Sequence, residues 1–377
     1  MKKISLSILT ALCIFCAPLS AYEWGGLLSN DLGVVAAKDT DTSIMDTIGI
    51  SAWYNAPLGS DGSCYLSSEA TFKYNIFSVA GENSGSGLFD VDLLKISKDI
   101  ENGDGKISIN AGRFSVVDST AAVFSQNSDG VSVKYILPQI QVAGYVGYTG
   151  LLNALNTSMY AALPDQKDIY SLAYPYLPVS LSLDFPVLLG NQSLGLQLNG
   201  FIDCGDYKTN LYYANAVLSG PITNSVYYNL ATSFGSADFD NLMNYTNLTV
   251  YAFPNEALTI SGGVEYASGD QGPFDPFYGV SAKTAASASV SPILSGVILP
   301  KAGVTYTTAD MCFDVGAKYL VSCLTSDIKG VGAELDAGFV YNIFSDLQLG
   351  LNVSKFIDTS DSNTDNFMAT LNLALAF

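Results

Sequence analysis

The side chains that usually carry chemistry are scarce in this sequence. Histidine is absent, which excludes Ser-His-Asp and Cys-His nucleophilic catalysis and every metal site that needs histidine. Arginine occurs once, as Arg113, so bidentate recognition of phosphate groups has almost no material to work with. The 35 Asp and Glu outnumber the 16 Lys and Arg and give a net charge of −19, which repels nucleic acid. We therefore expect neither an enzyme nor a nucleic-acid-binding protein.

Carboxylates are plentiful enough for glycosidase or protease chemistry, but no spacing singles out a pair of them. The segment Asn102–Gly105 superficially resembles the glycine turn of a calcium-binding loop. If Gly105 takes the glycine position of that loop, Ile100 and Ala111 fall where the first and last oxygen ligands are required. The segment is therefore interpreted as a hairpin turn, and we expect no catalytic residue, no metal and no cofactor.

The chain begins with the pattern of a secretory signal peptide. Lys2 and Lys3 precede an apolar core from Ile4 to Cys16, and small residues follow up to Ala21. The core is about 13 residues long, whereas a membrane-spanning helix needs about 20. Residues 1–21 are thus predicted to be a cleaved signal peptide, and 22–377 a single domain, since no break in composition divides them.

Four cysteines follow the signal peptide: Cys64, Cys204, Cys312 and Cys323. Export to an oxidising compartment permits disulfides between them. Cys312 and Cys323 bracket one expected strand and would lie about 35 Å apart at ~3.3 Å per residue, too far for a bond that needs Cα atoms within about 7 Å. Free thiols and the other pairings both stay open.

The composition favours a membrane protein without helical spans. Apolar residues make up 49% of the chain and the mean hydropathy is +0.27, yet only 14% of residues are charged, against about 25% in soluble proteins. A helical span needs roughly 18 consecutive apolar residues, and polar residues and prolines interrupt every long uncharged stretch. This combination predicts an all-β fold, a transmembrane antiparallel up-and-down β-barrel.

Strict alternation at the end of the chain supports that prediction. In 366–377, Phe367, Ala369, Leu371, Leu373, Leu375 and Phe377 share one face, which is the length and pattern of a transmembrane strand. A terminal phenylalanine after alternating apolar residues resembles the C-terminal signature of bacterial outer-membrane β-barrel proteins of the porin type. That resemblance implies insertion into the outer membrane by the barrel-assembly machinery, with Phe377 as part of the assembly signal.

The same alternation recurs along the chain, for example in 65–76, 311–322, 331–342 and 347–355. The second face carries Ser, Thr, Asn, Gln and Gly, which suits a confined aqueous interior better than the Lys-rich and Glu-rich exterior of a soluble sandwich. Aromatic residues near strand ends are interpreted as interfacial girdles, among them Trp24, Trp53, Tyr54, Phe114 and Tyr213. At about 20–22 residues for each strand with its connector, 22–377 gives about 16 strands, with 14 to 18 open.

The charged residues on the polar faces are predicted to line a pore. They are Glu69, Lys73, Arg113, Lys134, Asp203, Glu265, Asp314, Lys318, Glu334 and Asp336. Alternation alone would place Arg113 on the lipid side, where a charge is costly. Either a β-bulge at Gly112 turns Arg113 inward and Phe114 outward, or Arg113 extends its side chain to the membrane edge. We expect the bulge, with Asp118 as the partner of Arg113.

These features predict a porin-like channel of the bacterial outer membrane, through which small hydrophilic solutes diffuse passively. Acidic residues outnumber lysines on the inward faces, so we expect a weak preference for cations. The expected partners are outer-membrane lipid, the assembly machinery, the solutes and possible further copies of the chain, with no nucleic acid. Two alternatives stay open: a transporter of hydrophobic solutes of the fatty-acid type, and a surface-exposed adhesin or structural barrel.

Overall fold

The computed structural model describes residues 22–38, 40–59, 62–157, 159, 171–270, 273–281, 295–325, 327–360 and 365–377. The predicted signal peptide lies outside these residues. Within them, the only helical elements are two single turns, η1 (Ala154–Asn156) and η2 (Leu189–Asn191). No helix in the described part of the chain is long and apolar enough to cross a membrane.

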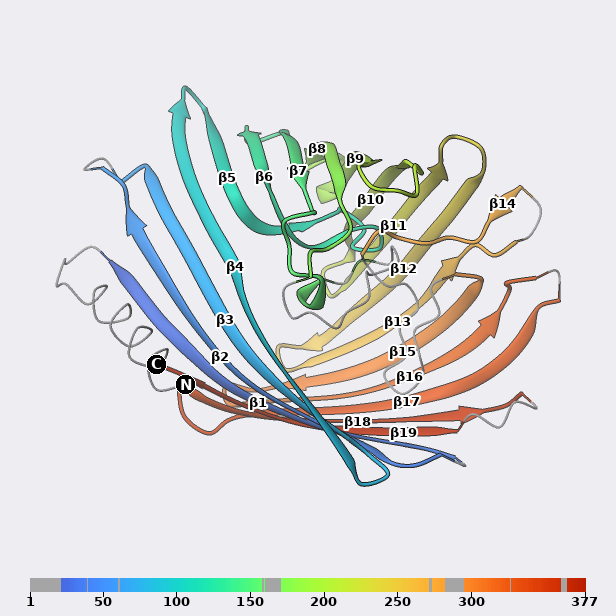
Figure 1. Ribbon diagram of the computed structural model, residues 1–377. Helices are drawn as coiled ribbons and strands as arrows, with labels where there is room; N and C mark the ends of the chain where they lie inside the picture. The colour runs from blue at the N-terminus through green and yellow to red at the C-terminus, as the bar shows by residue number, and fades with distance from the viewer. Residues whose placement is uncertain are drawn as a thin grey trace, which may run out of the picture.

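Nineteen strands make up the rest of the described fold (Figure 1). The first ten are β1 (Glu23–Ala37), β2 (Ser43–Pro57), β3 (Cys64–Val79), β4 (Glu82–Asn102), β5 (Gly105–Val117), β6 (Ser125–Ile136), β7 (Gln141–Tyr148), β8 (Tyr176–Phe185), β9 (Ser193–Asp203) and β10 (Leu211–Thr223). The others are β11 (Val226–Ala237), β12 (Leu242–Asn255), β13 (Leu258–Ala267), β14 (Phe274–Asp275), β15 (Val297–Thr307), β16 (Met311–Ser322), β17 (Lys329–Asn342), β18 (Leu347–Asp358) and β19 (Asn366–Ala376).

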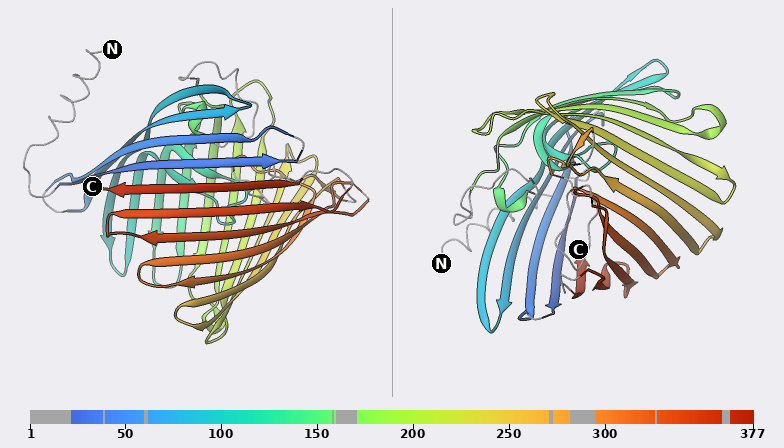
Figure 2. Two further views of the ribbon diagram at one scale, coloured as in Figure 1. Left: turned by 90° about the horizontal axis from the view of Figure 1, so that it is seen from below. Right: turned by 90° about the vertical axis from the view of Figure 1, so that its right-hand side faces the viewer.

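The strands close into a barrel. Each pairs antiparallel with the next along the chain, except that β13 pairs directly with β15. The two-residue β14 pairs parallel with the first residues of β12 and is not one of the strands that close the barrel. Figure 2 shows β1 and β19 side by side, and their ladder runs from Leu27 opposite Ala376 to Ala37 opposite Asn366. The predicted antiparallel barrel is confirmed.

The barrel has 18 strands, so the prediction of about 16 is wrong, although 18 lay within the range left open. The error comes from the connectors. Several turns at the end of the barrel that carries both termini are only two residues long, as between β4 and β5, β10 and β11, and β12 and β13. Such short turns leave room for more strands than an average connector allows.

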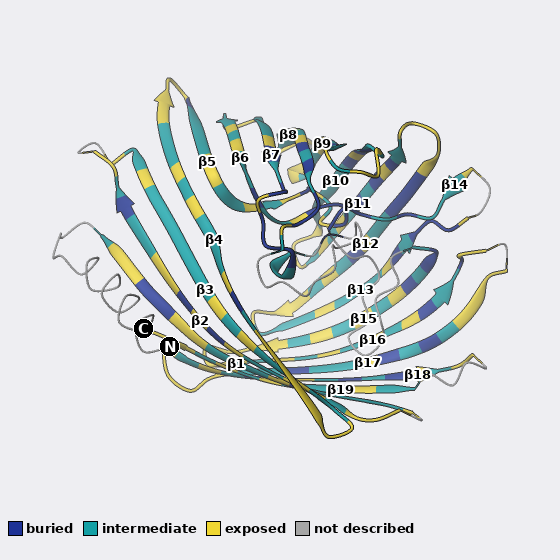
Figure 3. Cartoon of the chain, viewed as in Figure 1, coloured by how far each residue is buried: buried dark blue, intermediate teal, exposed yellow. Residues whose placement is uncertain are grey.

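The two faces of the wall differ as the alternation predicts. Opposite residues in an antiparallel ladder share a face, and Leu371 on β19 lies opposite Leu351 on β18 and Leu32 on β1. All three side chains are exposed, so they lie on the outer face of the barrel. The neighbouring Thr370 and Asn352 form a pair on the other face. Figure 3 shows the exposed positions repeating along these strands.

Two local predictions differ in outcome. Cys64, Cys204, Cys312 and Cys323 are free thiols in the structure, which settles the question of pairing that the sequence left open. Among the aromatic residues assigned to girdles, Trp24 and Tyr54 are opposite each other on the outer face. Tyr213, in contrast, is buried inside the barrel.

Candidate functional site

The connection between β5 and β6, residues 118–124, folds into the barrel, and we call it the inward turn. The Ser119 amide donates to Gln197 Oε1 of β9 at 2.7 Å, and Asn215 Nδ2 of β10 donates to Asp118 Oδ2 at 2.9 Å. Since β7 and β8 separate these strands from β6, the turn reaches them only across the interior. The face that carries Gln197 and Asn215 is therefore the interior face.

Asp118 holds the inward turn together. One carboxylate oxygen, Oδ1, accepts the amides of Val123 and Phe124 at 2.9 and 2.8 Å. The other, Oδ2, accepts the amide and the hydroxyl of Thr120 as well as the amide group of Asn215. Aspartate satisfies turn amides through its side chain in this way because its short carboxylate reaches amides a few residues further along. The buried carboxylate thus fixes both the shape of the turn and its position against β10.

A second stretch, residues 273–281 between β13 and β15, also folds inward, and we call it the second inward segment. Its Val280 amide donates to the carbonyl of Val123 at 2.7 Å, and its Tyr278 carbonyl accepts the hydroxyl of Tyr213 at 2.8 Å. Phe277 is fully buried between the rings of Tyr213 and Tyr245 at centroid distances of 6.2 and 5.5 Å. The two inward stretches therefore pack on each other and on the wall.

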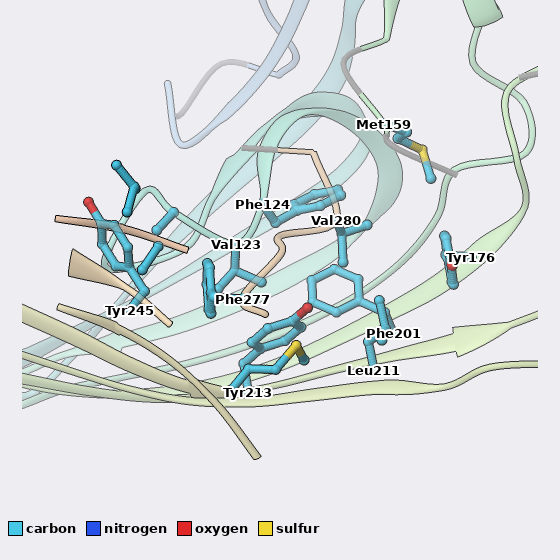
Figure 4. Close-up of a cluster of buried hydrophobic side chains, with 14 of the residues drawn as sticks. Val123, Phe124, Met159, Tyr176, Phe201, Leu211, Tyr213, Tyr245, Phe277 and Val280 are labelled. Carbon is cyan, nitrogen blue, oxygen red and sulfur yellow. The ribbon is translucent and has the colours of Figure 1, made fainter. Parts of the chain in front are cut away.

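An apolar cluster fills this part of the interior (Figure 4). It joins the inward turn and the second inward segment to side chains of β8–β13 and of β15–β18; the cluster includes Val123, Phe124, Phe201, Leu211, Tyr213, Met243, Tyr245, Phe277, Val280, Val297, Leu299, Leu320 and Phe356. Side chains of this kind inside a barrel exclude water locally and narrow the interior.

Charged residues lie on the interior face of β13 and β15–β17. Lys301 Nζ lies 3.3 Å from Glu265 Oε2. Lys318 Nζ lies 3.0 Å from Glu334 Oε1 and 3.4 Å from Asp336. The first pair is neutral, whereas the second group has one lysine for two carboxylates and a net charge of −1.

The ladders place most of the predicted pore-lining residues on the interior face. Successive pairings lead from Gln197 to Ser182, then to Ala143 and to Lys134. In the other direction the pairings lead from Asn215 to Ser233, then to Tyr245 and to Ala267 of β13. From Ala267 they continue across β15 to β17, on the face that carries the charged groups. The residues on this face are Glu69, Lys73, Lys134, Asp203, Glu265, Asp314, Lys318, Glu334 and Asp336.

Asp203 stabilises the connection that follows β9. Its carboxylate accepts the Tyr174 hydroxyl at 2.8 Å and the backbone amides of Gly205 and Thr209. These bonds shape the connection between β9 and β10, so this carboxylate is largely satisfied by the protein itself.

Arg113 differs from its predicted setting. The ladders of β5 with β4 and with β6 keep their register at Gly112, so the predicted bulge is absent. Gly112 instead has a φ of 121°, and the β4–β5 ladder ends at the next residue, Arg113. Figure 1 shows β5 curving away from the straight β4. A side chain at Gly112 would collide with the carbonyl oxygen of Leu94, and few residues besides glycine tolerate a positive φ.

The predicted partners of Arg113 are also wrong. Its guanidinium donates to both carboxylate oxygens of Asp129 at 2.9 and 2.8 Å and to Asp90 at 3.2 Å, while Asp118 belongs to the inward turn. Arg113 further donates to the carbonyl of Leu151 at 2.9 Å. Phe114 packs on Tyr145, which lines a cavity in the barrel interior, rather than facing outward. Arg113 thus ties β4, β5, β6 and the β7–β8 connection together where β4 and β5 part.

Sequence reasoning missed several interior residues. Lys301 was detectable, because it alternates with apolar residues in β15. Gln197 and Asn215 gave no signal, and Asp118 was named only as a partner of Arg113, since the contacts of the inward turn join residues 78 and 97 positions apart. Asp-Ser-Thr at 118–120 indicates a turn but not the direction in which the turn folds.

A closed antiparallel barrel with an interior narrowed by inward-folded connections is the architecture of bacterial outer-membrane porins. No protein-family model matches the sequence, and no curated protein matches it. Solved structures do match. The structure of Pseudomonas aeruginosa OpdK with vanillate has a TM-score of 0.64 at 12% identity, covering 96% of this chain and 100% of that one.

Two further structures agree. Pseudomonas aeruginosa OccK7 (OpdD) gives a TM-score of 0.65 at 10% identity, covering 95% of this chain and 99% of that one. Acinetobacter baumannii OccAB4 gives 0.62 at 10% identity, covering 95% and 98%. At these identities the likeness shows the fold alone, and that fold agrees with the antiparallel barrel that the alternation predicted.

Proposed function

We propose that this protein is a porin-like channel of the bacterial outer membrane, through which small hydrophilic solutes diffuse passively. The observation that carries the proposal is the closed barrel with an apolar outer face and an interior face of small polar and charged side chains. Such a wall offers a polar path through an apolar slab, and no chemical step is needed. The inward turn and the second inward segment narrow that path and set the size of the solutes that pass.

A weak preference for cations follows from the charges on the interior face of β13 and β15–β17. Lys301 and Glu265 cancel, while Lys318 neutralises only one of Glu334 and Asp336. Asp314 on the same face has no ion-pair partner among the described residues. Carboxylates in a lumen with low-dielectric walls raise the local concentration of cations.

A transporter of hydrophobic solutes is the second candidate, and the two functions are separable by experiment. Liposomes that contain the purified protein should swell in isotonic solutions of small sugars, because the polar interior admits hydrophilic solutes. Protein-free liposomes and liposomes with heat-unfolded protein are the controls. Swelling no faster than in the controls would contradict a diffusion channel and favour the hydrophobic-solute alternative.

Assembly by the barrel machinery is part of the proposal, and Phe377 tests it. The Phe377 amide donates to the Gly26 carbonyl at 3.0 Å and its carbonyl accepts the Gly26 amide at 2.8 Å, so the residue closes the seam between β19 and β1. Deleting Phe377 should lower the amount of folded, heat-modifiable barrel in the outer membrane about tenfold, since two seam hydrogen bonds and the terminal aromatic ring are lost. Phe344→Ala, an exposed aromatic in the β17–β18 turn, is the matched control. An unchanged yield would show that Phe377 is not an assembly signal.

A further inference from the structure

A half-enclosed cavity of about 180 Å³ lies between the inward turn and the interior face of β7–β9. Part of its lining, here called the polar side, has the hydroxyls of Ser132, Ser180 and Ser182 and the amide groups of Gln197 and Asn199. The apolar part of the lining includes the rings of Phe124 in the inward turn and of Phe201 in β9, whose centroids are 5.2 Å apart at 43°.

The polar side contains a buried donor that the protein leaves unused. Asn199 is 7% exposed, and its Nδ2 atom has no hydrogen-bond partner among the residues that the structure describes. The ladders of β9 hold the backbone of Asn199 between Ser180 of β8 and Tyr213 of β10. Buried amide groups are nearly always hydrogen-bonded, so this donor indicates an acceptor that the described residues do not supply.

The rest of the polar side is rigid. Gln197 Nε2 donates to Ser180 Oγ at 2.9 Å, while Gln197 Oε1 accepts the amide of Ser119 in the inward turn. Two side chains of the cavity are thereby locked to each other and to the turn. A bound molecule would therefore meet a preformed arrangement of hydroxyl and amide groups.

Charge excludes most ionic ligands. Asp118 is the one charged residue among those that line the cavity, and both of its oxygens accept hydrogen bonds from the turn and from Asn215. Among the described residues no lysine or arginine lines the cavity to hold an anion, and the carboxylate of Asp118 already accepts hydrogen bonds, so it offers little to a cation. The lining suits a neutral molecule that has hydroxyl groups on one side and C–H groups on the other.

We propose that this cavity is a binding site for a small uncharged polyhydroxy compound, between a triol and a single sugar ring in size. The volume equals about six times the ~30 Å³ share of one water molecule. A ligand hydroxyl accepts from Asn199 Nδ2, the serine hydroxyls bond its other hydroxyls, and its C–H face rests on Phe124 and Phe201. The inference rests on the proposed channel function and names one class of solute that the channel holds on its way through.

Calorimetric titration of the folded, detergent-solubilised barrel tests the site without requiring an open channel. Ribose and glycerol are the probes, and sodium acetate is the charged comparison. The wild type should bind ribose saturably and acetate not at all. Asn199→Leu should weaken ribose binding about tenfold by removing the donor. Asn352→Leu, which changes an exposed interior asparagine of β18, should bind as the wild type does.

Folding of each variant is checked by heat-modifiable mobility. If Asn199→Leu does not fold, Ser182→Leu serves instead, because its bulk fills the cavity from the neighbouring strand. Ribose binding that is absent from the wild type, or equal in the wild type and the cavity variant, would overturn the site. Conductance of the same preparations in planar bilayers is measured separately. A conducting wild type without ribose binding overturns the site alone, whereas ribose binding without conductance supports the site and overturns the channel function.

Discussion

Replacing Asp118 with alanine should raise the single-channel conductance about twofold, because the inward turn loses the group that holds it across the interior. The carboxylate accepts backbone amides of Val123 and Phe124 and the side-chain amide of Asn215. Without it these buried donors have no partner, at a cost of about 1–3 kcal/mol each. The turn should then leave its place on β10 and widen the path.

Single-channel recording in planar bilayers measures the change, with Asp104→Ala as the matched control. Asp104 is an exposed aspartate in the two-residue turn between β4 and β5, outside the barrel wall. The control should conduct as the wild type does. A folded Asp118→Ala barrel with unchanged conductance would show that the inward turn does not limit the path.

Neutralising Glu334 and Asp336 together should weaken the preference for cations. Both carboxylates lie within 3.4 Å of Lys318 Nζ, so Glu334→Gln with Asp336→Asn turns a group of net charge −1 into one of +1. The replacements keep the size of both side chains, and glutamine can still accept from Lys318 in the buried position of Glu334. We expect the cation-to-anion permeability ratio to fall at least about twofold, because charges in a narrow lumen focus counter-ions.

Reversal potentials under a potassium chloride gradient give this ratio directly. The control is Glu256→Gln with Asp346→Asn, which makes the same change in charge in two exposed turns. Charges in exposed turns are screened over about 8 Å at physiological salt, so the control should keep the wild-type permeability ratio. An unchanged ratio in the Glu334 and Asp336 variant would remove these carboxylates as the selectivity element.

The strands of the barrel wall were predictable because the outer and inner faces of each strand meet different environments, which select different residue types at alternate positions. A strand between lipid and a wet interior must alternate, so Leu351 and Asn352 indicate their own faces without any knowledge of their neighbours. Ladder register then carries the same assignment from strand to strand. The strand number was less accessible, because it depends on connector lengths that alternation does not report.

The interior contacts were not predictable, since they depend on residues far apart in the chain. Asp118 meets Asn215 and Ser119 meets Gln197 only after the barrel has closed. Arg113 illustrates the same limit. Local alternation identified it as anomalous, yet its partners Asp90 and Asp129 come from the two strands that flank β5, and the nearby Asp118 is committed to its own turn.

Single-channel conductance of the folded wild-type protein in a planar bilayer tests the channel function most directly. The proposed function predicts discrete, stable current steps in potassium chloride and a reversal potential that favours cations modestly, because the interior face carries polar side chains and a local excess of carboxylates. Folded barrels that insert into the bilayer and carry no current would contradict an open polar path, and with it the proposed function.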